Sequence, residues 1–192
     1  MSLARLGFVP VLGLFPLLAF GCSDPVPPLP RGAISLHYNS PSFQKCALNS
    51  HYAKIGSISE ASFDKVVVDG EGGAAIDCSV TGNGPFAVSA SASGTTEGKS
   101  YSFSMTIGSI RGSATEMEPA TGSVAYSSTQ TSLEVSSSAS DEPCIFYFNA
   151  DAGQTIATGK IWVTFQCPKM LLDTKVCEID TGYAVFENCE TD

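Results

Sequence analysis

The 192-residue sequence is poor in charged residues, and positively charged residues are the scarcer kind. Charged residues make up 15% of the chain, and 10 Lys and Arg stand against 19 Asp and Glu. Proteins that bind nucleic acid or adsorb to anionic lipid headgroups rely on Lys and Arg for their attraction to phosphates. The composition therefore indicates that nucleic acid is not a partner and that electrostatic adsorption does not hold the protein on a membrane.

The sequence also lacks the common motifs of catalysis. It has two histidines, His37 and His51, and no GxSxG, HExxH or P-loop motif. Two SxxK tetrads begin at Ser42 and Ser62, but the companion SDN and KTG motifs are missing, so we interpret both as chance matches. We therefore predict no catalytic residue and no enzymatic activity. The alternative is a secreted hydrolase, which requires a cleft where one histidine meets a serine or a carboxylate.

The apolar run near the N-terminus is too short to cross a membrane as a helix. Residues 6–20 carry no charge and follow Arg5, whereas a transmembrane helix needs ~20 apolar residues. A short apolar run behind a positive charge is typical of a signal peptide. The run leads into the hexapeptide Leu17-Leu18-Ala19-Phe20-Gly21-Cys22.

This hexapeptide resembles the lipobox of bacterial lipoproteins, in which small residues precede an obligatory cysteine. The resemblance implies that residues 1–21 are a lipoprotein signal peptide and that Cys22 receives a diacylglyceryl group. It also implies that the amine of Cys22, once freed by cleavage, is acylated, with palmitate among the expected chains. The alternative is an ordinary secretory signal cleaved after Ala19 or Gly21, with Cys22 as a plain thiol.

The residues after Cys22 predict a spacer. Four prolines occur among residues 23–32, a density that favours extended polyproline II at ~3.1 Å per residue. Residues 22–32 would then be a lipidated cysteine and a Pro-rich tether that holds a domain away from the membrane. Under the sorting rule of enteric lipoproteins, Asp directly after the cysteine retains the protein in the inner membrane. Ser23 stands at that position, so the resemblance favours the outer membrane of the cell envelope, on either face.

The remaining cysteines predict three disulfide bonds. They are even in number, and an exported protein meets an oxidising compartment. The six residues are Cys46, Cys78, Cys144, Cys167, Cys177 and Cys189. Their sequence gaps of 32, 66, 23, 10 and 12 residues lack the short ligand spacing of zinc sites, so we expect no metal and no cofactor. Of the 15 connectivities that six cysteines allow, we predict Cys46–Cys78, Cys144–Cys189 and Cys167–Cys177.

Alternating hydrophobicity predicts an all-β domain over residues 33–192. The clearest run is Lys99–Gly108, where Tyr101, Phe103, Met105 and Ile107 alternate with Ser and Thr. About ten short antiparallel strands separated by glycine-rich turns favour a two-sheet β-sandwich, jelly-roll or Ig-like, stapled by the disulfides. The other predicted strands cover residues 34–38, 66–69, 75–80, 86–91, 123–127, 132–136, 144–149, 160–167 and 182–188. The expected core contains Phe86, Phe103, Ile107, Phe146, Phe148, Val163, Phe165 and Phe186.

Three segments are less regular. Residues 41–54 and 57–65 are predicted to form a helical turn or a long loop, with Ser57 as a helix cap. The acidic Gly-rich segment at residues 69–73 is predicted to be a solvated hairpin turn, with a calcium site as the alternative.

Aromatic residues supply the only ligand candidates. Trp162 is out of phase with Ile161 and Val163, so we expect it on the outer face of its strand, and Tyr38 and Tyr126 are further candidates. The predicted function is a membrane-anchored envelope lipoprotein with a non-enzymatic binding or structural domain, whose partner is an envelope protein or a glycan. The alternative is a carbohydrate-binding module in which Trp162, Tyr52 and the two other tyrosines stack on sugars.

Overall fold

The computed structural model describes residues 27–40, 46 and 48–191. The predicted signal peptide, Cys22 and residues 23–26 of the predicted tether lie outside these residues. The described part is all-β, with three short 3-10 turns, η1 (Glu71–Gly73), η2 (Thr129–Thr131) and η3 (Ala150–Ala152), and no α-helix. No helix in this part of the chain is long and apolar enough to span a bilayer.

The strands lie along the chain between Arg31 and Glu187. They are β1 (Arg31–Asn39), β2 (His51–Ile55), β3 (Ser57–Ile58), β4 (Phe63–Lys65), β5 (Val67–Val68), β6 (Ala75–Gly82), β7 (Phe86–Thr96), β8 (Lys99–Ile110), β9 (Ala120–Ser128), β10 (Ser136–Ser138), β11 (Cys144–Tyr147), β12 (Thr155–Ala157), β13 (Lys160–Leu172) and β14 (Lys175–Glu187). Strand β10 begins at Ser136, later than predicted, because Ser132 and Leu133 have positive φ values that a strand does not accommodate.

Hydrogen bonding joins twelve of these strands into one antiparallel sheet, in the order β2-β1-β14-β13-β10-β9-β8-β7-β6. Strand β11 also pairs with both β13 and β9, while β12 pairs with β13 and β5 with β1. The other two strands, β3 and β4, form a separate hairpin. One large sheet and one small hairpin therefore stand where two comparable sheets were expected.

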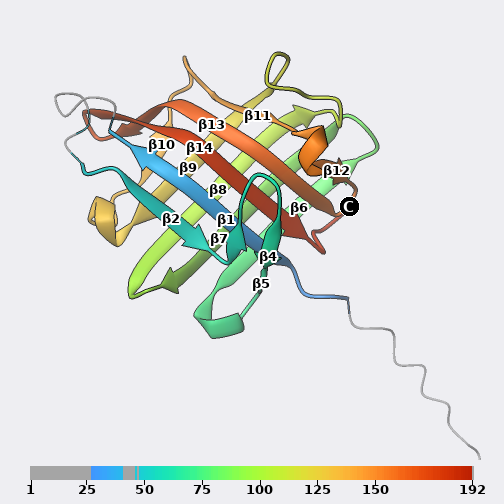
Figure 1. Cartoon of the computed structure of the whole chain (residues 1–192), viewed down its shortest axis with the longest axis horizontal. Helices are drawn as coiled ribbons and strands as arrows, with labels where there is room; N and C mark the ends of the chain where they lie inside the picture. The colour runs from blue at the N-terminus through green and yellow to red at the C-terminus, as the bar shows by residue number, and fades with distance from the viewer. Residues whose placement is uncertain (1–26, 41–45, 47, 192) are drawn as a thin grey trace, which may run out of the picture.

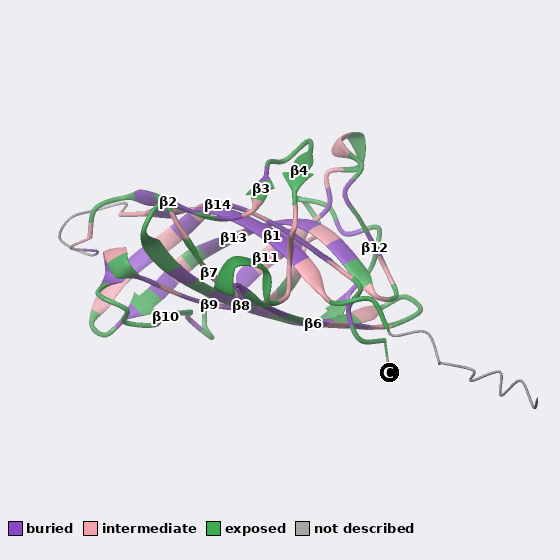
Figure 2. Cartoon of the chain, turned by 90° about the horizontal axis from the view of Figure 1, so that it is seen from below, coloured by how far each residue is buried: buried purple, intermediate pink, exposed green. Residues whose placement is uncertain are grey.

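The large sheet folds over so that its two halves face each other (Figures 1 and 2). Strands β2, β1, β14 and β13 form one layer, and β9, β8, β7 and β6 form the other, with the strands of the two layers crossing in Figure 1. The core fills the space between the layers, where the ring centroids of Phe103 and Phe165 lie 5.4 Å apart. The residues expected in the core are buried, except that Phe86 is only partly so.

Three disulfide bonds form, as predicted, but none of the three predicted pairs is correct. The bonds are Cys46–Cys177, Cys78–Cys189 and Cys144–Cys167. Cys167 and Cys177 are near in sequence, yet they lie at different levels of the hairpin formed by β13 and β14. Cys167 is opposite Ile179, and Cys177 is opposite Met170.

The two segments predicted as loop or helix contain strands instead. Residues 51–55 form β2, in which His51, Ala53 and Ile55 face inward while Tyr52 and Lys54 face out. Residues 57–65 contain the β3–β4 hairpin, in which Ser57 begins β3 opposite Lys65 rather than capping a helix. The helical prediction was wrong because the buried side of β2 includes a histidine, which weakens the alternation of apolar residues.

Both ends of the domain lie at the same pole. Strand β1 begins at Arg31, whose guanidinium lies 2.8 Å from the carboxylate of Glu187 at the end of β14. Beyond β14, the backbone of Glu190 accepts a hydrogen bond from Val80 N and donates one to Cys78 O. The segment after β14 thus covers part of the outer edge of β6, an edge that would otherwise expose unpaired backbone groups.

Candidate functional site

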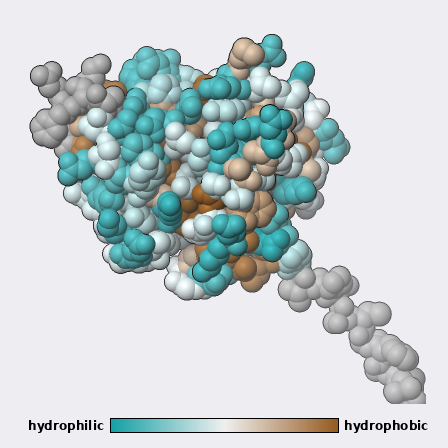
Figure 3. All heavy atoms as spheres, in the orientation of Figure 1, coloured by the Kyte–Doolittle hydropathy of each residue, from teal (hydrophilic) through white to brown (hydrophobic). Residues whose placement is uncertain are grey.

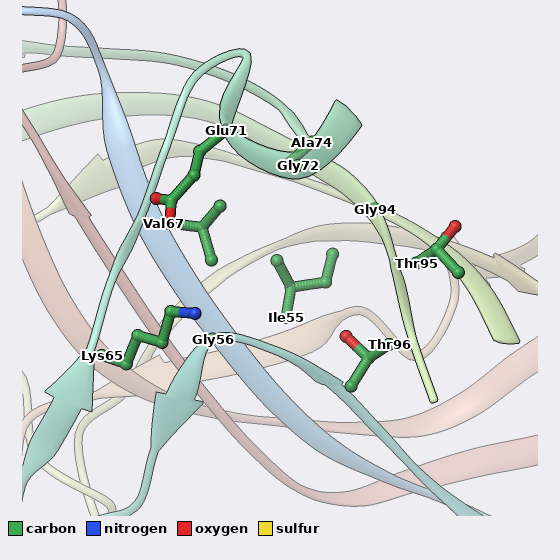
Figure 4. A pocket seen from close by; sticks show the side chains of 10 residues that line it. All are labelled: Ile55, Gly56, Lys65, Val67, Glu71, Gly72, Ala74, Gly94, Thr95 and Thr96. Atoms are coloured by element: carbon green, nitrogen blue, oxygen red, sulfur yellow. The ribbon is translucent and has the colours of Figure 1, made fainter. Parts of the chain in front are cut away.

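A pocket opens where the end of β2, the short strand β5, η1 and the end of β7 meet (Figure 4). Its volume is about 230 Å³, and we call it the β2–β7 pocket. Its lining residues are Ile55, Gly56, Lys65, Val67, Glu71, Gly72, Ala74, Gly94, Thr95 and Thr96. Figure 3, in the orientation of Figure 1, shows hydrophobic atoms in a hollow at the lower centre of this face, where Figure 1 draws β4 and β5.

Local backbone geometry builds the pocket. Gly56 has φ +74°, and a Cβ at this position would lie 2.8 Å from the Cβ of Ala33, so only glycine lets the chain turn from β2 into β3 here. On the opposite side, Asp69 Oδ1 accepts a hydrogen bond from Ile76 N at 2.9 Å, and Asp69 N donates to Pro30 O. These bonds tie the turn that carries η1 to Pro30, the residue before β1.

The chemistry of the pocket is divided between its floor and its rim. Ile55 is buried and Val67 partly buried, so they supply apolar surface, while the Lys65 ammonium and the Glu71 carboxylate stand at the rim. Glu71 Oε2 accepts a hydrogen bond from Val68 N at 3.2 Å, which orients the carboxylate. The ion pairs of the described residues involve other side chains, so Lys65 and Glu71 do not neutralise each other.

The segment at residues 69–73 is an exposed turn, as predicted, but it is not a hairpin turn, because β5 pairs with β1 and β6 pairs with β7. Within the described residues, no group of three or more His, Cys, Asp or Glu side chains is placed to hold a metal ion.

A second cluster lies on the outer face of β1 and β14. Nδ1 of His37 lies 2.9 Å from both carboxylate oxygens of Asp180, which also accepts a hydrogen bond from Asn39 Nδ2. The ring of Tyr52 stacks on His37 with a centroid distance of 4.5 Å and keeps 64% of its surface exposed. The hydrolase alternative needs a cleft where a histidine meets a serine or a carboxylate. His37 meets the Asp180 carboxylate, but it does so on the outer face of the sheet, and no described serine hydrogen-bonds to His37.

The other histidine is part of the core. His51 is 9% exposed, and its Nδ1 lies 3.0 Å from the carbonyl oxygen of Asn49, which can only accept. The proton therefore sits on Nδ1, and Nε2 accepts a hydrogen bond from the Tyr126 hydroxyl at 2.8 Å. Burial lowers the pKa of His51 and raises the pKa of Tyr126 and of Tyr38, so all three groups are neutral near pH 7.

The structure separates the four candidate stacking residues. Tyr38 and Tyr126 are buried in the core, so neither ring offers a face to a ligand in solvent. Trp162 points to the outer face of β13, as predicted, but the β3–β4 hairpin lies over it and Phe63 contacts it edge-on at a centroid distance of 5.1 Å. Tyr52 remains as the exposed ring.

Sequence reasoning missed the β2–β7 pocket. Glu71 and Gly72 belong to a segment interpreted as a turn, with a calcium site as the alternative, and Ile55, Lys65 and Thr95 gave no local signal. These residues come from separate segments between positions 55 and 96, and strand pairing alone brings them together. The chain matches no protein-family model, no curated protein and no solved structure.

Proposed function

We propose that this protein is a lipoprotein of the bacterial cell envelope whose β domain is a non-enzymatic binding module. The observation that supports the proposal most strongly is that the cysteines fall into two groups. The six cysteines of the domain all pair with one another, and the seventh, Cys22, stands in the lipobox-like hexapeptide. Three disulfides suit an oxidising compartment, which is where a lipoprotein domain is exported.

The lipid anchor would supply the attachment to the membrane. Burial of acyl chains contributes ~0.8 kcal/mol per CH₂, so two or three chains on Cys22 hold a protein stably on a bilayer. The Pro-rich segment between Cys22 and Arg31 would then act as the spacer. Ser23, rather than Asp, after the cysteine favours the outer membrane.

Binding is favoured over catalysis by the surroundings of the two histidines. His37 contacts a carboxylate on an open sheet face, and His51 is buried against Tyr126. No serine among the described residues hydrogen-bonds to either imidazole, whereas the β2–β7 pocket presents unneutralised charges to solvent.

The test is the intact mass of the protein purified from the membrane fraction of an expressing Gram-negative host. We expect a chain that begins at Cys22, heavier by its acyl chains and lighter by six hydrogens for its three disulfides. The Cys22→Ala variant should lose the acyl mass and leave the membrane fraction. A wild-type chain without acyl mass would refute the anchor, and free thiols would refute the compartment.

Carbohydrate binding is the second candidate function, because the exposed ring of Tyr52 stacks on His37, which in turn contacts the Asp180 carboxylate. Aromatic stacking on sugars needs such an open ring face. Retention of the mature chain on insoluble peptidoglycan, compared with Tyr52→Ala, tests it. Equal retention of the two proteins would rule out a sugar site at Tyr52.

A further inference from the structure

We propose that the β2–β7 pocket binds a free α-amino acid with an aliphatic side chain, its carboxylate at Lys65 and its ammonium at Glu71. This inference rests on the proposed binding function and names the ligand class of the pocket.

The rim of the pocket carries one positive and one negative side chain, Lys65 and Glu71. An ammonium and a carboxylate line one small pocket without forming an ion pair, although a pair would satisfy both groups. The Glu71 carboxylate is held in place by Val68 N, and Figure 4 shows the Lys65 side chain extending toward Ile55. Such a rim complements a ligand that carries both an anionic and a cationic group, because charge-assisted hydrogen bonds are the strongest available at a polar site.

The floor of the pocket is apolar and therefore favours a ligand with an aliphatic side chain. Ile55, Val67 and Ala74 offer apolar surface, with no aromatic ring in the lining on which a sugar could stack. An aliphatic side chain buried there gains ~25 cal/mol for each Å² removed from water. The Thr95 and Thr96 side chains stand on the opposite wall, where hydroxyls can bond to the remaining oxygen of a ligand carboxylate.

The size of the pocket limits the ligand further. Pockets for drug-sized ligands have volumes of ~300–1,000 Å³, and the β2–β7 pocket holds about 230 Å³. The pocket is therefore too small for a drug-sized ligand but is of a size for a single amino acid. Glycine at position 94 keeps this space open, because a Cβ there would reach 3.6 Å from Ala74 Cβ and 4.0 Å from Ile55 Cγ2.

The test is isothermal titration of the mature, lipidated chain in detergent with leucine and valine. Isovalerate, which lacks the ammonium, and isoamylamine, which lacks the carboxylate, are the matched probes. We expect both amino acids to bind, and each probe to bind about tenfold more weakly or worse, since each loses one charge-assisted contact. Because Val67 pairs with Gly32 near the end of the tether, phosphoethanolamine tests whether a lipid headgroup is preferred. Tighter binding of phosphoethanolamine than of leucine would overturn the assignment.

Variants assign the binding to this pocket. Lys65→Met and Glu71→Gln should each weaken leucine binding about tenfold, and Glu71→Gln keeps an acceptor for Val68 N. Gly94→Val should abolish binding by filling the pocket at a strand position without positive φ. Lys175→Met and Gly108→Ala are the controls, and Gly108 is a strand glycine with no atom near its added Cβ.

Full binding by Gly94→Val, or no binding of either amino acid to the folded wild type, would overturn the inference. Acyl chains on the same preparation, measured by mass, would show that the envelope proposal stands even so. Loss of acyl chains with retained leucine binding would contradict the envelope proposal and leave the pocket inference in place.

Discussion

Phe165 on β13 lies directly opposite Gly182 on β14, and its ring occupies the space that a side chain at position 182 would need. A Cβ on Gly182 would come within 3.0 Å of three ring carbons of Phe165. That ring is fully buried and also packs on Phe103 and Phe146, with centroid distances of 5.4 and 5.9 Å. The glycine thus lets one aromatic ring fill the centre of the core from the longest hairpin of the sheet.

Gly182→Ala should therefore destabilise the domain, because the Phe165 ring is enclosed and cannot swing aside. Overpacking of this kind costs ~1–3 kcal/mol, measured as the free energy of unfolding in urea. Gly108→Ala, where the added methyl meets no atom, should change stability little. The double variant Gly182→Ala/Phe165→Leu should be closer to Phe165→Leu alone than the two single effects added together. Full additivity would show that the methyl and the ring do not collide.

The three disulfides should differ in their contribution to stability. Cys46–Cys177 links residues 131 apart and Cys144–Cys167 residues 23 apart. Loop-closure entropy predicts ~5 kcal/mol for the first and ~3.5 kcal/mol for the second. Urea unfolding of the paired Cys→Ala variants measures both losses. The reverse order would mean that native contacts around the bonds, rather than chain entropy, decide their effect.

The stability of the domain should decrease as the pH is lowered, because of His51. Burial of the ring lowers its pKa below the ordinary value of 6.5, and Lys99 and His37 lower it further, while the Asn49 carbonyl opposes the shift. The unfolded chain then takes up the proton at a higher pH than the folded domain does. This contribution to stability is present above pH ~6.5 and is lost as the pH falls toward the folded pKa.

Urea midpoints between about pH 7.5 and about pH 5.5 test this expectation. His51→Gln should show a shallower loss of stability on acidification than the wild type. His37→Gln, which leaves the buried ring in place, should retain the wild-type dependence on His51. Identical slopes for His51→Gln and the wild type would contradict the expectation.

The β3–β4 hairpin should shield Trp162, the one tryptophan of the chain. Phe63→Ala removes the edge-on contact, which contributes ~0.5–1.5 kcal/mol for an aromatic pair. We expect emission at longer wavelength and faster quenching by acrylamide. Met117→Ala, at a 93% exposed position on the β8–β9 connection, is the control and should leave both signals unchanged. An unchanged spectrum for Phe63→Ala would show that the hairpin does not protect the ring.

The pattern of apolar residues was sufficient to predict a strand and its buried side where the residues on the other side are small and polar. In β8, Tyr101, Phe103 and Met105 are buried while the intervening serines are exposed, so alternation predicted both the strand and its buried side. The same reasoning placed Trp162 on the outer face of β13. Cysteine parity, together with the predicted signal peptide, predicted three disulfides.

The pattern of apolar residues was not sufficient to predict features that depend on contacts between residues far apart in the sequence. His51 is on the buried side of β2, where the hydroxyl of Tyr126, 75 residues away, satisfies its Nε2. The two halves of the sheet are joined through β10 and β11, which have only 3 and 4 residues, and such short strands carry little periodicity. The predicted Cys167–Cys177 bond fails because the two residues are not opposite each other across β13 and β14, where bulges shift the register.

The shared pole of the two chain ends makes the opposite pole of the domain a natural place for display. Strand β14 runs 13 residues from Lys175 to Glu187, and ~3.3 Å per residue puts its first residue some 40 Å from its last, which lies beside Arg31. A peptide spliced into the turn between Leu172 and Lys175 would be carried at that far pole. An epitope grafted there should be accessible to an antibody while the folded core and both chain ends stay untouched.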